Sequence, residues 1–203
     1  YSIFYDMNIG LYFGSFNPVH VGHLIIANHI IQNTNINELW FIVSPQNPFK
    51  NTHSLLNENH RLSMLRTAIE GENRLRASNI EFKLPKPSYT VNTLAYLSEK
   101  YPKHSFTIIM GSDGFRNIDK WKNYKAITEN YPIIIYKRPG FEIENDFGAK
   151  ISILDAPLLE ISSTHIRKMI REGKSVRYLV TDAVLEEIEK HYYYRSASEN
   201  PAE

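Results

Sequence analysis

Two histidines, His20 and His23, have the type and spacing to bind one phosphate group together. They lie in the segment GSFNPVHVGHL, which also contains Gly14 and Gly22. Glycine lets a backbone approach a ligand closely, and the free N–H groups at a helix start favour an anion. Residues three apart share one face of a helix, so both imidazoles can donate to the same ligand. The segment therefore predicts an anion-binding site.

Two other interpretations of this histidine pair stay open at this point. The first is an ordinary tight turn in which both rings are satisfied by the protein. The second is a zinc site, but the chain has no Cys, and no Asp or Glu occurs between Met7 and Glu38. A third zinc ligand would have to come from a distant segment.

A second polar cluster, EISSTHIRK, lies late in the chain. Ser162, Ser163 and Thr164 are capping candidates for a helix, and Arg167 lies one turn inside it. Hydroxyls, free N–H groups and a guanidinium would then converge at one helix N-terminus, which suits phosphate. The structural alternative is a good N-cap followed by a surface arginine.

Alternating strand and helix patterns surround both clusters. The expected strands are Ile9–Phe13, Glu38–Val43, Leu75–Phe82, Ser105–Met110, Tyr131–Tyr136 and Ile151–Leu154. The expected helices are Leu24–Ile31, Leu55–Ile69, Val91–Tyr101, Trp121–Glu129, Ser163–Glu172 and Asp182–Tyr192. This alternation predicts an α/β fold with a doubly wound, mostly parallel, Rossmann-like sheet. Ligands of such folds bind beyond the carboxyl ends of the strands, where the histidine segment lies.

The composition of the chain limits the classes of partner that we expect it to bind. Lys and Arg number 23 against 22 Asp and Glu, so no overall positive field favours nucleic acid or an acidic membrane. The lack of Cys is compatible with a reducing compartment, and no apolar run approaches the ~20 residues of a membrane span. We expect a cytoplasmic protein.

The 203 residues fit one domain. The first strand pattern begins only after Met7, so residues 1–6 are expected to be an upstream remnant and 7–194 the domain. Residues 195–203 are polar without periodicity, and we expect a flexible tail. The sequence leaves the oligomeric state open, a homo-oligomer included.

The two clusters resemble the signatures of a known superfamily. GSFNPVHVGHL resembles the glycine and His-x-Gly-His signature of the nucleotidylyltransferases, and ISSTHIRK resembles their second signature. Five further segments resemble bacterial nicotinate-nucleotide adenylyltransferases in the same order: SPQNPFK, PSYTVNTL, MGSDGFRNIDKWKNY, YKRPG and YLVTDAVLEEIEKHYYY. The resemblance covers essentially Met7 to Tyr194, with one departure, Thr181, where the family often has Pro.

The resemblance implies transfer of AMP from ATP to nicotinate mononucleotide, giving nicotinate adenine dinucleotide and pyrophosphate in NAD biosynthesis. It implies that His20 and His23 act around the reacting phosphorus, and that Arg167 binds the outer phosphates. The other implied ATP-binding residues are Gly14, Ser15, Phe16, Gly22, Lys50, Asp113, Ser162 and Ser163. Lys50 has a solvated surface lysine as its alternative, and Asp113 has a helix N-cap.

The mononucleotide is expected to bind Asn17, Thr90 and Trp121. Thr90 lies at an expected helix start, where its hydroxyl and free N–H groups suit a carboxylate, and Trp121 would stack on the pyridine ring. The alternative is that Thr90 is only an N-cap and Trp121 only a core residue. Mg²⁺ is implied as an ion carried by the substrate phosphates, so no metal-ligating residue is expected.

Two kinds of alternative activity, a sister transferase and a non-catalytic nucleotide sensor, remain at this stage. Sister transferases of the superfamily act on nicotinamide mononucleotide, alone or with dual specificity, or on phosphopantetheine, FMN or glycerol phosphate. Class I aminoacyl-tRNA synthetases have similar histidine signatures, but this chain lacks their length and a basic tRNA-binding surface. A non-catalytic nucleotide sensor could keep the same fold.

Overall fold

The computed structural model describes residues 6–46, 54–157 and 160–195. Its strands are β1 (Asn8–Gly14), β2 (Glu38–Val43), β3 (Leu75–Ser78), β4 (Ser105–Gly111), β5 (Ile133–Tyr136) and β6 (Ile151–Leu154). They form one six-stranded sheet in the order β3-β2-β1-β4-β5-β6, and every neighbouring pair is parallel. The predicted doubly wound α/β fold is confirmed, with this sheet wholly parallel. Successive strands are added on one side of β1 up to β3 and on its other side from β4 onward. The switch point between β1 and β4 is the place where such sheets bind ligands.

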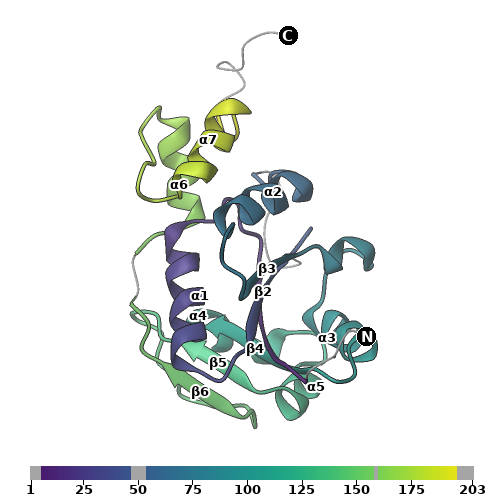
Figure 1. The fold of residues 1–203 in the computed structure, drawn as a ribbon. Coiled ribbons are helices and arrows are strands. Elements are labelled where there is room, and N and C mark those ends of the chain that lie inside the picture. The colour runs from purple at the N-terminus through teal and green to yellow at the C-terminus, as the bar shows by residue number, and fades with distance from the viewer. Residues whose placement is uncertain (1–5, 47–53, 158–159, 196–203) are drawn as a thin grey trace.

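Helices cover both faces of the sheet (Figure 1). They are α1 (Val21–Asn33), α2 (Glu58–Ala68), α3 (Thr90–Lys100), α4 (Ser112–Phe115), α5 (Tyr124–Asn130), α6 (Ser163–Arg171) and α7 (Asp182–Lys190). Helices α1, α2 and α7 contribute to one buried cluster, and α3 and α5 to a second on the opposite face. In Figure 1, α6 and α7 lie together beyond the end of the sheet, beside α2. Within the described ranges, no helix is both long and apolar enough to cross a membrane.

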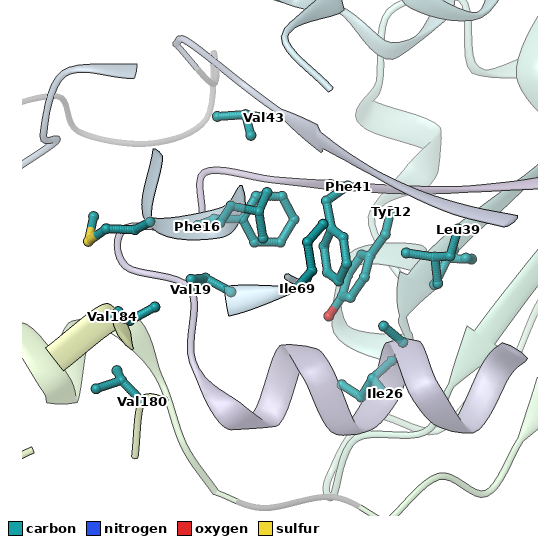
Figure 2. Close-up of a cluster of buried hydrophobic side chains, with 14 of the residues drawn as sticks. Tyr12, Phe16, Val19, Ile26, Leu39, Phe41, Val43, Ile69, Val180 and Val184 are labelled. Atoms are coloured by element: carbon teal, nitrogen blue, oxygen red, sulfur yellow. The ribbon is translucent and has the colours of Figure 1, made fainter. Parts of the chain in front are cut away.

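Strand β1 is buried on both faces, as a central parallel strand requires. Ile9 and Leu11 belong to the second cluster, whereas Tyr12 belongs to the first and stacks on Phe41 with 5.6 Å between ring centroids. Figure 2 shows these two rings side by side above α1. Gly10 is needed for close packing, because an added Cβ would lie 2.7 Å from Cδ1 of Ile109. The strand is therefore a rigid support for the loop that follows it.

In two of the predicted elements, a local turn replaces part of the predicted strand or helix. The third strand ends at Ser78 instead of Phe82, because Ile80–Lys83 is a 3₁₀ helix whose local bonds replace the strand ladder. The helix predicted from Trp121 begins at Tyr124, because Trp121 ends a 3₁₀ helix, Ile118–Lys120, and Asn123 turns with a φ of 51°. Local turn geometry overrides the apolar spacing at both places.

Candidate active site

A cavity of about 780 Å³ opens at the carboxyl ends of β1 and β4. It brings together most of the residues predicted for the site: Gly14, Ser15, Phe16, Asn17, His20, His23, Thr90, Asp113, Trp121, Ser162, Ser163 and Arg167. Lys50 lies outside the described residues. Gly22 does not line the cavity; a Cβ there would lie 3.0 Å from Nδ1 of His20, so this glycine makes room for the imidazole.

The two histidines form a stacked pair at the start of α1. His20 occupies the N-cap position, its ring centroid is 3.7 Å from that of His23, and the ring planes differ by 24°. The His20 N–H donates to Nδ1 of His23 across 3.2 Å, so a neutral His23 carries its hydrogen on Nε2 and is a donor there. Figure 2 shows the part of α1 just beyond this pair, at Ile26.

His20 is neutral at physiological pH. Its ring is buried, and this burial, with a smaller contribution from the Arg138 charge, lowers its pKa from 6.5 to about 4. Its Nδ1 has no hydrogen-bond partner in the part of the chain that the structure describes. The ring can therefore act on a phosphate as a neutral hydrogen-bond donor, without first losing a proton.

The loop between β1 and α1 is shaped by Phe16. This residue has a left-handed φ of 47°, and its ring folds back over Gly14, where an added Cβ would lie 2.8 Å from the Phe16 ring. Asn17 fixes the other side of the loop: its amide donates to the Ser54 carbonyl across 2.8 Å and accepts from the Leu56 N–H across 3.2 Å. Asn17, which was predicted to bind the mononucleotide, therefore uses its side chain to join this loop to the segment before α2.

The start of α6 is attached to this loop. Ser162 caps the helix by accepting from the His165 N–H, as predicted, at 3.2 Å. The Ser163 hydroxyl donates to the Pro18 carbonyl at 2.9 Å, and Nη1 of Arg167 donates to the Asn17 carbonyl at 2.8 Å. The two polar clusters of the sequence therefore meet at one edge of the cavity.

Asp113 lies inside α4, whose N-cap is Gly111, so the N-cap interpretation of this aspartate is wrong. Its Oδ1 is 3.3 Å from Nε of Arg138, which also lines the cavity. The Arg138 N–H donates to the Ser112 hydroxyl at 2.9 Å. Sequence reasoning assigned no role to Arg138, although its place just past β5, at the ligand-binding edge, was an available signal.

The far end of the cavity holds the residues predicted for the mononucleotide. Thr90 is the first residue of α3 and Tyr89 is its N-cap, so the N-cap interpretation of Thr90 is wrong. Trp121 is partly buried against the second cluster and lines the cavity. Nζ of Lys122 lies 4.5 Å from the Tyr89 ring centroid, and both residues line the cavity. Lys122 was missed because an exposed lysine in a polar loop has no distinctive pattern.

Glu81 is a second carboxylate in the cavity wall, and its side chain is buried. Its Oε1 accepts from the Thr93 hydroxyl at 2.8 Å, and burial raises its pKa. Across the described ranges, no three His, Asp or Glu side chains gather as a metal-binding group. Glu81 therefore bonds a hydroxyl of α3 and belongs to no metal-binding group of three among the described residues.

Sequence comparison finds a family model and curated relatives that match this chain. The family model described as cytidylyltransferase-like matches residues 11–169. A Cytophaga hutchinsonii protein named "probable nicotinate-nucleotide adenylyltransferase" is 50% identical over 93% of this chain and 98% of its own length. A Bacteroides fragilis protein of the same name is 42% identical over 88% of this chain and 90% of its own length.

The fold matches solved structures as well. A Plasmodium falciparum nicotinic acid mononucleotide adenylyltransferase complexed with NaAD superimposes with a TM-score of 0.80, at 23% identity, over 93% of this chain and 97% of that one. Because the sequence identity is only 23%, this similarity shows a shared fold and nothing more. The family model and the curated relatives together establish that this chain belongs to the cytidylyltransferase-like family and, within it, to the nicotinate-nucleotide adenylyltransferases.

Proposed function

We propose that this protein transfers the adenylyl group of ATP to nicotinate mononucleotide, releasing pyrophosphate and forming nicotinate adenine dinucleotide. An oxygen of the mononucleotide 5′-phosphate forms a bond to the α-phosphorus of ATP, and the bond from that phosphorus to the pyrophosphate oxygen breaks. No general base is required, because a phosphate monoester with a second pKa of about 6 is largely ionised at neutral pH. The observation that carries the proposal is the stacked, partly buried histidine pair beside Arg167.

The residues act by alignment and by charge stabilisation, which dominate phosphoryl-type transfers. His20 and His23 donate to the α-phosphate oxygens, on which charge increases in the transition state. Arg167 binds the outer phosphates and the departing pyrophosphate, for which a planar guanidinium is well suited. Ser162 and the backbone of Gly14 to Phe16 complete the phosphate site, and Asp113 accepts from a ribose hydroxyl of adenosine.

Mg²⁺ fits this site as an ion brought by the substrates. Asp113 is 3.3 Å from the Arg138 guanidinium and Glu81 bonds Thr93, so neither carboxylate is arranged as a dedicated metal ligand. When bound, Mg²⁺ would supply positive charge that neutralises part of the phosphate charge. His20, His23 and Arg167 would stabilise the charge that the ion leaves.

We propose that the acceptor is the acid and not the amide. Helix α3 begins at Thr90, and the N–H groups of Thr90 and Val91 have no acceptor among the residues described. A carboxylate accepts at both oxygens, whereas the NH₂ of a carboxamide leaves one donor unpaired. Trp121 would stack on the pyridine ring, and the Lys122 ammonium beside Tyr89 adds positive charge.

A turnover assay with ATP and a panel of phosphorylated acceptors tests both proposals. We expect pyrophosphate release with nicotinate mononucleotide, and roughly a few hundredfold lower kcat/KM with the amide. Preference for phosphopantetheine, FMN or glycerol phosphate would identify a sister transferase. Binding without pyrophosphate release would identify a nucleotide sensor, and amide use within about tenfold of the acid would mean dual specificity.

The cellular location of the enzyme and its partners form a separate proposal. The near-zero formal charge of +1 and the lack of Cys support an enzyme that acts on small molecules in the cytoplasm, without nucleic acid or membrane partners. Cell fractionation tests the location, and sedimentation tests whether the enzyme is a homo-oligomer.

A further inference from the structure

Arg61, in α2, is the largest side chain with almost no exposed surface, and its exposed fraction is 0%. Arginine is almost never fully buried unless it is paired with an acid. Arg61 forms no ion pair with a carboxylate in residues 6–46, 54–157 and 160–195. Glu58, one helical turn away, bonds Nζ of Lys86 at 2.7 Å instead. A buried, unpaired guanidinium requires a reason other than a local ion pair.

The guanidinium bonds main-chain carbonyls of the two loops that follow β1 and β2. Nη1 donates to the Ser15 carbonyl at 2.5 Å and to the Ser44 carbonyl at 2.8 Å. Nη2 donates to the Pro45 carbonyl at 3.3 Å, and Nε donates to the Leu56 carbonyl at 2.7 Å. Ser15 and Ser44 both line the cavity. Arg61 therefore joins two walls of the site from behind without lining it.

The bond to Ser15 fixes the direction of the next N–H group. In a planar trans peptide, the carbonyl of one residue and the N–H of the next point in opposite directions. Because the Ser15 carbonyl is held toward Arg61, the Phe16 N–H is directed away from α2. Phe16 lines the cavity, and its N–H has no acceptor among the residues described.

The positive charge of Arg61 also favours the binding of an anion at this loop. Arginine stays protonated at neutral pH, and a charge in the protein interior is screened less than a surface charge. The Ser15 and Ser44 carbonyls compensate the guanidinium only as dipoles. A net positive charge therefore lies behind a loop that faces the polyanionic substrates.

We propose that Arg61 is a positioning residue for adenylyl transfer: it holds the Ser15–Phe16 peptide so that the Phe16 N–H donates to a substrate phosphate, and it adds positive potential behind that loop. This inference rests on the proposed function. Arg61 itself touches no substrate.

Arg74 provides a matched control. It also donates to main-chain carbonyls, to Asn37 at 3.0 Å, Ile31 at 3.1 Å and Ile36 at 2.6 Å. These carbonyls precede β2, at the amino end of the sheet and away from the cavity. Substituting Arg74 removes a comparable set of bonds without affecting the site.

The experiment compares Arg61→Lys with Arg74→Lys, both assayed well below their melting temperatures. Lysine keeps the charge but loses the fork that bonds several carbonyls at once. We expect Arg61→Lys to lower kcat by roughly tenfold or more with a smaller change in KM, and Arg74→Lys to change kcat less than about twofold. A folded Arg61→Lys enzyme with kcat within about threefold of wild type would reduce Arg61 to a purely structural residue.

A titration of the wild-type protein keeps the test independent of variant folding. Inorganic pyrophosphate is added to ¹⁵N-labelled enzyme, and the Phe16 amide proton is expected to move downfield as it gains an acceptor. Pyrophosphate that shifts the His23 signals and leaves the Phe16 amide unchanged would overturn the inference. Failure of the wild-type enzyme to turn over any acceptor would instead overturn the proposed function, which this titration does not measure.

Discussion

The two arms of the proposed phosphate site differ in how the rest of the protein supports them. The first arm, Gly14 to His23, follows the central strand β1 and is largely buried, with His20 only 6% exposed. The second arm, Ser162 to Arg167, starts a helix outside the sheet and is mostly exposed or partly exposed. Its attachment to the first arm includes polar bonds to the carbonyls of Asn17 and Pro18, and Ile166 of the same helix is buried in the first cluster.

This difference predicts a division of labour. Donors on a rigid, desolvated support stabilise transition-state charge best, because they need no reorganisation during the reaction. Side chains at the exposed start of a helix outside the sheet are less constrained, so they can adjust to a bound triphosphate. Changes in the first arm should therefore lower kcat, whereas changes in the second should mainly affect the use of ATP.

The largest expected effect is that of His23→Ala. We expect kcat to fall by roughly 10²-fold or more with little change in KM for the mononucleotide, because the lost donor acts on the developing charge. His29→Ala is the control, since His29 lies on the same helix but not in the cavity wall. Steady-state kinetics with kcat within threefold of wild type would remove His23 from the reaction.

The second prediction concerns the pH dependence of stability. The pKa of His20 is lowered from 6.5 to about 4 by burial, so as the pH falls the unfolded chain takes up the proton first. Stability is therefore lost as the pH falls from about 6.5 toward 4, with about 2 kcal/mol of that loss between pH 7 and pH 5. Urea unfolding of His20→Asn should lack this part of the loss. Parallel pH profiles for the two proteins would mean that His20 is not buried as a neutral ring.

The third prediction is that Arg167→Lys lowers kcat/KM for ATP by roughly tenfold, because one ammonium cannot reproduce a bidentate fork. The KM for the mononucleotide should change little. Arg171→Lys is the control, as Arg171 is exposed on the same helix. An Arg167→Lys enzyme with unaltered ATP kinetics would make Arg167 a surface residue that only attaches α6.

Sequence patterns sufficed for the first arm and for the sheet. Short apolar runs flanked by turn residues located all six strands, and Gly14 with the histidine pair indicated the strand end at which the cavity opens. These features are local, so one sequence is enough to recognise them. The packing role of Gly22 could not be recognised in this way. A Cβ at Gly22 would lie closest to the ring of His20, and that packing depends on the folded turn.

The residues that were missed owe their position to tertiary structure. Arg138 meets Asp113 across 25 residues of sequence, and Lys122 meets Tyr89 across 33. Arg61 reads as an ordinary charged residue in the helical segment NENHRLSML, and only the fold shows that α2 turns it toward the carbonyls behind the cavity. Charged helix residues are usually exposed, so the pattern predicted the wrong environment.

The smallest expected effect distinguishes attachment from phosphate contact in the second arm. The Ser163 hydroxyl has one hydrogen, which it donates to the Pro18 carbonyl at 2.9 Å, so it has none left for a phosphate oxygen. Ser163→Ala should cost about 1 kcal/mol of attachment, or roughly fivefold in kcat/KM for ATP.

Ser162→Ala is the matched variant, because it removes the N-cap bond to His165 and leaves the Pro18 bond in place. It should lower the free energy of unfolding by about 1 kcal/mol. A loss of roughly 10²-fold in kcat for Ser163→Ala would instead mean that this hydroxyl turns from Pro18 to the reacting phosphate. The second arm would then share the catalytic role that the comparison assigns to the first.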